Sequence, residues 1–254
     1  MDITPLDPRD LNLPRRNESP RQVVSVQRKT TVHSQQARPP MTLTIIGTGP
    51  LARAIGCRMI DANVKVAFVD DDFFRTCSLA AELGRRTRKM STVEPRTFEQ
   101  PILGEIVVLT GPYECVPYFI DTYGDRLAGT IVIDTTNPIN AQSDDFVTPP
   151  GSSGAEEIAK LLPEGTRLVK AFNTIFAQTL SMKCVAGQAI DVFIAGDDAE
   201  AKEKVADLVE TAGLLPVDVG ELKRSRQIEA VALLHISLQP TLETDFMSAV
   251  KIIS

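Results

Sequence analysis

Short apolar runs alternate with amphipathic segments along most of this chain. Strands are predicted where apolar residues cluster, many of them β-branched, at residues 43–46, 64–70, 89–93, 105–113, 130–138, 166–174, 191–196 and 214–220. Helices are predicted where apolar residues recur at helical spacing, at residues 74–83, 116–127, 155–162, 198–212 and 224–238. Strands that alternate with helices form a parallel sheet with right-handed crossovers, so the predicted fold class is α/β.

The same pattern divides the chain into three parts. Residues 1–40 hold six of the 17 prolines, no glycine and no aromatic residue, a composition that predicts a disordered tail. Residues 41–180 hold the main parallel sheet. Residues 181–254 are predicted to form a smaller C-terminal α/β unit, which serves a dimer interface or the substrate pocket.

The junction between the first strand and its helix is the most informative segment. Its glycines have the Gly-x-Gly-x-x-Ala spacing of a dinucleotide-binding turn, although turn glycines also precede helices for conformational reasons alone. Gly47 permits the tight turn, Gly49 lets the backbone approach phosphate oxygens, and Ala52 allows close helix packing. We therefore predict a Rossmann-type doubly wound sheet with the helix N-terminus facing the pyrophosphate. The predicted cofactor contacts in this loop are Gly47, Thr48, Gly49, Pro50, Leu51 and Ala52.

An acidic run after the second predicted strand supports the same interpretation. Asp70 lies about 20 residues beyond the glycines, where a carboxylate can accept both hydroxyls of an adenosine ribose. Asp71 and Asp72 follow it, and three carboxylates in a row disfavour the 2′-phosphate of NADP. NAD is therefore favoured over NADP. One of the last two aspartates is also expected to cap the next helix.

Other strands also end in glycine or polar residues. Because the carboxyl ends of parallel strands meet at one edge of the sheet, Gly111, Asn137 and Asn173 are expected to converge with the glycine loop. Each asparagine has a structural alternative: the first can make a turn before Pro138, and the second can cap a helix that begins near residue 175.

Composition narrows the function classes. The chain is 43% hydrophobic and 24% charged, and no apolar run approaches the ~20 residues that span a bilayer, so no membrane partner is expected. Four cysteines lie scattered without a C-x-x-C pair, which predicts reduced thiols in a cytoplasmic protein and no metal site. Without residues 1–40, 20 basic and 29 acidic residues remain, a formal net charge of −9 that argues against nucleic acid as a partner.

The last predicted helix is apolar over more of its circumference than a surface helix needs. Ile228, Val231, Leu234 and Leu238 mark one stripe, so this helix is expected to pack between domains or across a homodimer interface. His235 lies among them and is interpreted as a packed histidine, with contact to a substrate as the alternative.

Six segments together resemble the family of NADP-dependent coenzyme F420 reductases, which itself resembles the cytosolic domains of transmembrane ferric reductases. In chain order they are TIIGTGPLARAIG, EIVVLTGPYECV, VIDTTNP, SSGAEEIAKLLP, VKAFNTIFA and EAVALLHISL. The resemblance implies that the glycine loop binds the dinucleotide. It also implies a nicotinamide side at Pro112 and Tyr113 and a reacting face at Asn137 and Asn173. Gly111 stands at the nicotinamide end where the family usually has a bulkier apolar residue, and Thr174 is a further candidate to orient the carboxamide.

Three functions follow as hypotheses. Hydride transfer between nicotinamide and a flavin-like ring needs close stacking more than a side-chain acid, so the first is an NAD(P)-dependent oxidoreductase with deazaflavin F420 or a flavin as small-molecule co-substrate. The second is a reductase of a small carbonyl or imine, which would need a proton donor, Tyr113 or His235. The third is a regulator that binds NAD(P) without turnover.

Overall fold

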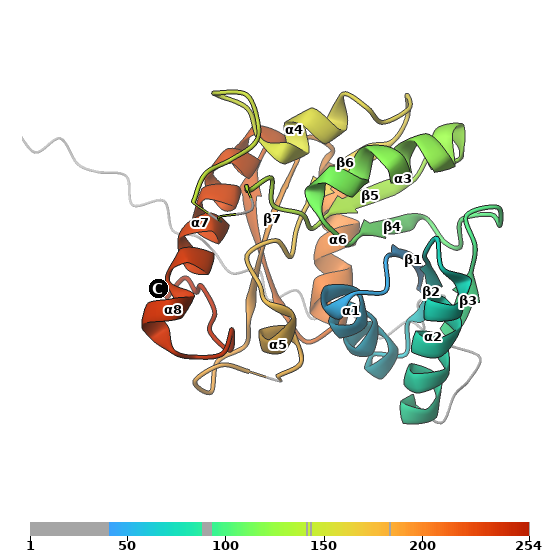
Figure 1. Cartoon of the computed structure of the whole chain (residues 1–254), viewed down its shortest axis with the longest axis horizontal. Coiled ribbons are helices and arrows are strands. Elements are labelled where there is room, and N and C mark those ends of the chain that lie inside the picture. Colours follow the sequence, from blue (N-terminus) through green and yellow to red (C-terminus); the bar gives the residue numbers. More distant parts are fainter. Residues whose placement is uncertain (1–40, 88–92, 141, 143, 183, 254) are drawn as a thin grey trace, which may run out of the picture. The chain divides into compact units, whose positions relative to one another are not determined.

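The structure, a computed structural model, describes residues 41–87, 93–140, 142, 144–182 and 184–253. The predicted disordered tail at residues 1–40 lies outside the described residues, as does most of the strand expected at residues 89–93. Among the described residues, eight strands form one sheet with helices around it (Figure 1). The strands are β1 (Thr42–Ile46), β2 (Lys65–Val69), β3 (Val93–Arg96), β4 (Ile106–Leu109), β5 (Ile131–Asp134), β6 (Arg167–Lys170), β7 (Asp191–Gly196) and β8 (Leu215–Gly220). The helices are α1 (Pro50–Asp61), α2 (Phe73–Thr87), α3 (Val116–Tyr123), α4 (Gly154–Ala159), α5 (Ala177–Leu180), α6 (Ala199–Thr211), α7 (Ser225–Ser237) and α8 (Gln239–Leu242).

The sheet has the strand order β3-β2-β1-β4-β5-β6-β7-β8. Its first six strands are parallel, and the order reverses between β1 and β4, the switch point at which doubly wound sheets bind ligands. The predicted α/β class and Rossmann-type sheet are therefore confirmed.

The strands after residue 180 extend this sheet. β7 pairs antiparallel with β6, and β8 pairs parallel with β7. All described residues fall in one compact unit. The strands expected in a smaller unit at residues 181–254 thus share the main sheet, because the end of β7, a strand buried along its whole length, pairs with Val169 and Lys170 of β6.

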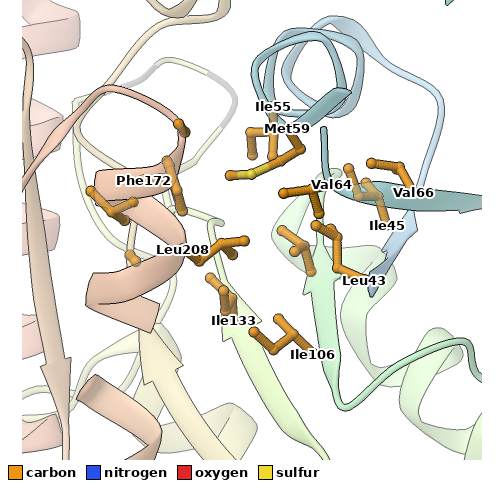
Figure 2. Close-up of a cluster of buried hydrophobic side chains, with 14 of the residues drawn as sticks. Leu43, Ile45, Ile55, Met59, Val64, Val66, Ile106, Ile133, Phe172 and Leu208 are labelled. Carbon is orange, nitrogen blue, oxygen red and sulfur yellow. The ribbon is translucent and has the colours of Figure 1, made fainter. Parts of the chain in front are cut away.

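Apolar residues of β1, β2, β4, β5 and β6 alternate between two cores. On one face, Leu43 and Ile45 of β1 pack with Ile55 and Met59 of α1, in a cluster that also takes in α2 and α6 (Figure 2). Ile46 points to the other face, where its cluster is covered by residues of α3 and α4. Burial on both faces explains why the strands are apolar runs rather than alternating patterns.

One glycine sets how closely α1 approaches the sheet. A Cβ added at Gly56 would lie 2.3 Å from Cζ of Phe68, a fully buried ring of β2. A real Cβ cannot stand at that distance, so either the helix or the ring would have to move.

We expect Gly56→Ala to lower the free energy of unfolding by about 1–3 kcal/mol, because overpacking outweighs the gain in helix propensity. Urea unfolding measures this change. In a Phe68→Leu background, which gives the new methyl group room, the same substitution should cost little. Equal costs in the two backgrounds would show that the contact with Phe68 is not what limits this position.

Candidate functional site

The turn after β1 brings the backbone close to β4. Gly47 has a φ of +108°, and a Cβ there would lie 2.3 Å from the carbonyl oxygen of Thr110. Its N–H donates to the carbonyl of Val69 at 2.7 Å, so the turn lies between the ends of β2 and β4. Gly49 precedes α1 as its N-cap residue, and a Cβ at this position would meet nothing within 4 Å. Pro50 then occupies the first turn of the helix, where its missing N–H has no cost.

A cavity of about 750 Å³ opens over this turn. Its volume lies within the range of pockets that hold small molecules and cofactors. The lining includes nine of the ten predicted cofactor-binding residues: Gly47, Thr48, Gly49, Pro50, Leu51, Ala52, Asp70, Gly111 and Pro112. It also includes residues that the sequence did not single out for binding: Asp71, Arg75, Thr110, Glu114, Cys115, Tyr118 and Phe119.

The carboxylate of Asp70 faces this cavity from the end of β2. Thr48 Oγ1 donates to its Oδ2 at 2.7 Å, and the Asp72 N–H donates to its Oδ1 at 3.1 Å. Burial raises the pKa of Asp70, but hydrogen bonds with the side chain of Asp71, with Thr48 and with the Asp72 N–H, together with the charge of Arg75, outweigh burial and lower it. The group is therefore an anion whose position is fixed by the glycine loop itself.

Arg75 bridges the acidic run. Its guanidinium lies 3.2 Å from Asp70, 3.0 Å from Asp71 and 3.3 Å from Asp72. Asp72 also accepts from the N–H groups of Phe74 and Arg75, so it is the aspartate that caps α2, as expected for one of the pair. One cation is thus shared among three carboxylates, and this end of the cavity keeps an excess of negative charge.

Aromatic rings form the wall on the α3 side. Tyr118 is 54% exposed, and Phe119 stacks on Phe98 with ring centroids 5.9 Å apart. The sequence signal for this wall was the pair of aromatic residues in the helix after the Gly111-Pro112 turn. Aromatic residues in a predicted helix usually belong to the core, so this pair alone does not indicate the wall of a cavity.

Tyr113, the tenth predicted cofactor-binding residue, does not line the cavity. A Cβ at Gly154 would lie 3.0 Å from Tyr113 Cε2, so the ring packs beside the start of α4. Burial, followed by the charges of Glu157, Glu229 and Asp134, raises the pKa of Tyr113. Its side chain turns to α4 because it stands in the short 3-10 helix (Tyr113–Cys115) that follows the Gly-Pro turn.

The two predicted asparagines meet at the carboxyl ends of β5 and β6. Asn137 Nδ2 donates to the carbonyl of Asn173 at 2.9 Å, and Asn173 Nδ2 donates to Asn137 Oδ1 at 2.9 Å. Asn173 is 6% exposed, and its buried Oδ1 has no hydrogen-bond partner among the described residues. Phe172 just before it has a φ of +66°, a strained conformation for a bulky residue. Asn173 is not a helix cap, because α5 begins later with Phe176 as its N-cap residue.

Beneath the asparagines lies a buried ionic cluster that the sequence did not reveal. Lys170 Nζ lies 2.7 Å from Asp134 Oδ2 and 2.8 Å from Glu229 Oε1, and all three side chains are almost fully buried. Burial lowers the pKa of Lys170, but the charges of Asp134 and Glu229 outweigh it, so the pKa is raised and the amine stays protonated.

His235 packs behind this edge, as interpreted from the sequence. Its Nδ1 lies 3.2 Å from the carbonyl of Thr174 and its Nε2 lies 2.8 Å from Ser248 Oγ. Its ring centroid is 4.5 Å from that of Phe176. Burial lowers the pKa of His235, although the hydrogen bond to Thr174 opposes this, and the neutral imidazole is favoured. Asn137, Asn173, Thr174 and His235 do not line the large cavity.

Two features of other protein classes are absent from the described residues. No helix in the described part of the chain is long and apolar enough to cross a membrane. No group of three or more histidine, cysteine or acidic side chains in that part is arranged to hold a metal ion.

Comparisons with known proteins connect this site to one family. The profile of the family described as NADP oxidoreductase coenzyme F420-dependent matches residues 42–138. The F420-dependent NADP reductase of Methanothermobacter thermautotrophicus is 31% identical over 207 residues, which are 78% of this chain and 89% of that protein. The solved structure of a proposed F420-dependent NADP reductase from Arthrobacter sp. fb24 has a TM-score of 0.69 and 25% identity, covering 83% of this chain and 98% of that one.

A second kind of relative is longer. Metalloreductase STEAP3 of Rattus norvegicus is 30% identical over 189 residues, which are 74% of this chain. The chain spans about a third of that protein, since the match covers 36% of its length.

Proposed function

Because this chain belongs to the family of coenzyme F420-dependent NADP oxidoreductases, we propose that it passes a hydride between a nicotinamide dinucleotide and a flavin-like ring, the deazaflavin of coenzyme F420 or a flavin. The observation that supports this most strongly is the cavity over the glycine turn at the switch point of the sheet. Its position, rather than any single side chain, fits an oxidoreductase whose chemistry belongs to the bound cofactors.

The residues of this cavity fit a dinucleotide. The open space beside Gly49 leaves room for a phosphate against the backbone, and α1 directs its N-terminal N–H groups there. The carboxylate of Asp70 would accept hydroxyls of the adenosine ribose. The aromatic wall at Tyr118 and Phe119 supplies apolar surface on the α3 side of the cavity.

NAD is the dinucleotide that we propose, in preference to NADP. A 2′-phosphate beside Asp70 would meet two further carboxylates, and Arg75, the cation that lines the described part of the cavity, is already shared by all three. Like charges at this distance disfavour the phosphate more than Arg75 can favour it.

Isothermal titration calorimetry of the full chain with NADH, and separately with NADPH, tests this preference. We expect NADH to bind more tightly, and Asp70→Ala to weaken NADH by about tenfold, the equivalent of 1.4 kcal/mol, while NADPH changes less. Asp121→Ala, on the exposed side of α3, is the matched control and should leave both affinities unchanged. Tighter binding of NADPH by the unmodified protein would overturn the preference for NAD, and binding of neither would overturn the proposed function.

The reaction end of the site is proposed at Asn137, Asn173 and Thr174. A bound dinucleotide supplies a hydride, two electrons with one proton, and the acceptor ring completes its reduction with one further proton from water. The protein then needs to orient rings and exclude water rather than to supply an acid. The unpartnered Oδ1 of Asn173 is suited to accept a hydrogen bond from an amide N–H of the nicotinamide.

Replacement of Asn173 separates an enzyme from a regulator that only binds the dinucleotide. We expect Asn173→Ala to retain NADH affinity within about twofold and to slow hydride transfer to a flavin or deazaflavin by about tenfold to a hundredfold, since orientation is lost. Stopped-flow absorbance of NADH measures the transfer, and Asn140→Ala is the control, because this half-buried asparagine three residues beyond Asn137 bonds to Asp144 and not to Asn173. An unchanged rate would remove Asn173 from the site. Absence of transfer in the unmodified protein, despite tight binding, would favour the regulator.

A reductase of carbonyls or imines is the weaker alternative. It needs a proton donor, and the two candidates are Tyr113 and His235. Burial lowers the pKa of His235, which leaves little protonated imidazole at neutral pH, and burial raises the pKa of Tyr113, which makes its hydroxyl a weaker acid. Hydride transfer to a ring that is protonated by water needs neither residue.

The proposal includes a homodimer formed through α7 and α8. Leu234, Leu238 and Leu242 follow one another at intervals of four residues and are 60%, 41% and 45% exposed, whereas Ile228 of the predicted stripe is buried. A second copy of this surface would cover the three leucines by isologous contact.

Sedimentation velocity tests the dimer. We expect the unmodified chain to sediment as a dimer and Leu234→Glu/Leu238→Glu to sediment as a folded monomer, because the exposed side chains add little to the core of one chain. Leu161→Glu, 50% exposed after α4, controls for added surface charge. A monomeric unmodified chain would contradict this part of the proposal.

A further inference from the structure

The ends of β5 and β6 are joined at two levels. Asp134 and Lys170 are direct partners in the pairing of these strands, and their side chains form an ion pair. Each is followed three residues later by an asparagine. These two asparagines, Asn137 and Asn173, are joined by two hydrogen bonds and form a second pair, the amide pair. The ion pair therefore lies at the base of the two loops, and the amide pair joins them further along.

Thr136 connects the two levels. Its N–H and Oγ1 donate to Asp134 Oδ1 at 2.8 and 2.7 Å, and its carbonyl accepts from Lys170 Nζ at 2.6 Å. Every polar group of Thr136 is thus bound to one member of the ion pair. Because Asn137 is the next residue, the ion pair fixes the backbone from which that side chain extends.

Glu229 brings α7 into the same cluster. One carboxylate oxygen lies 2.8 Å from Lys170 Nζ, and the two oxygens accept from the N–H groups of Gly154 and Ala155 at 2.9 and 3.2 Å. The side chain is 2% exposed. It therefore holds α4, β6 and α7 together around a single ammonium group.

We infer that Asp134, Lys170 and Glu229 are positioning residues, which hold the Asn137–Asn173 pair in the geometry that hydride transfer requires. This rests on the proposed function in so far as the pair faces the nicotinamide. The three ionised side chains are costly to bury, and apolar residues of similar size would serve stability as well. Their complete set of hydrogen bonds instead fixes the conformation of the loops that emerge from β5 and β6.

The chain offers a matched pair of variants on the same two helices. Glu229→Gln removes the negative charge beside Lys170. It also leaves one side-chain oxygen for three donors, Lys170 Nζ and the N–H groups of Gly154 and Ala155, which share two carboxylate oxygens in the unmodified protein. Arg226→Gln breaks the other link between α7 and α4, an exposed bond from Arg226 to Glu156 at 2.6 and 2.8 Å that does not touch Lys170. If Glu229 only tied the two helices together, both variants would have the same effect on the asparagines. If it positions the asparagines, only Glu229→Gln should affect them.

The first readout needs no cofactor. In protein labelled with ¹⁵N-asparagine, the side-chain amide signals of Asn137 and Asn173 should shift and exchange faster with water in Glu229→Gln, and should stay in place in Arg226→Gln. The second readout is transfer from NADH, which Glu229→Gln should slow by about tenfold with less than a twofold change in NADH affinity, because the dinucleotide cavity lies on β1 and β2.

Each outcome decides the inference. Unmoved amide signals in Glu229→Gln, or equal shifts in the two variants, would overturn it, whether or not the protein transfers hydride. Moved signals with an unchanged rate would leave the proposed function intact and overturn the positioning role. If Glu229→Gln does not fold, Thr136→Val removes only the Oγ1 bond to Asp134 and should give the same two changes; unmoved signals there would overturn the inference.

Discussion

The whole site depends on a close approach that only glycine permits, between the end of β1 and the end of β4. The missing side chain of Gly47 leaves room for the carbonyl of Thr110, and the positive φ turns the chain across the switch point. The N-terminus of α1 then points into the cavity instead of along the strand. With a side chain at position 47, β1 and β4 would have to separate, and the turn that lines the cavity would be displaced.

The other end of the site is built on the opposite principle. At β5 and β6 full-sized polar side chains are buried, and each is satisfied by a partner from another element. Lys170 donates to three acceptors, and Thr136 uses all of its polar groups. Among the described residues, two buried side-chain atoms have no hydrogen-bond partner: Asn173 Oδ1 at this edge and Ser225 Oγ at the start of α7. An unpaired acceptor in an otherwise satisfied cluster is costly, so its retention favours a role with a ligand.

Local patterns predicted the fold and most of the residues that line the large cavity, and long-range contacts decided the rest. The strands, the switch point and the glycine loop follow from short motifs whose geometry is nearly independent of context. The antiparallel pairing of β7 with β6 does not, because the residues of an apolar strand do not indicate which strand it pairs with or in which direction. Lys170 stands within an apolar run that gives no indication of a buried charge. Its contact with Glu229 joins residues far apart in the sequence, so no local pattern could predict it. The direction of the Tyr113 ring depended on the position of α4.

The division between the two ends coincides with the reach of the family profile. The matched residues 42–138 contain the glycine loop, Asp134 and Asn137, but their partners Lys170 and Asn173 lie beyond them. Glu229 lies further still, on α7. All residues that line the large cavity therefore lie within the matched segment, whereas the proposed reaction end needs both parts of the chain. Changes after residue 138 can alter the proposed reaction end, and with it the choice of second substrate, without replacing any residue that lines the cavity.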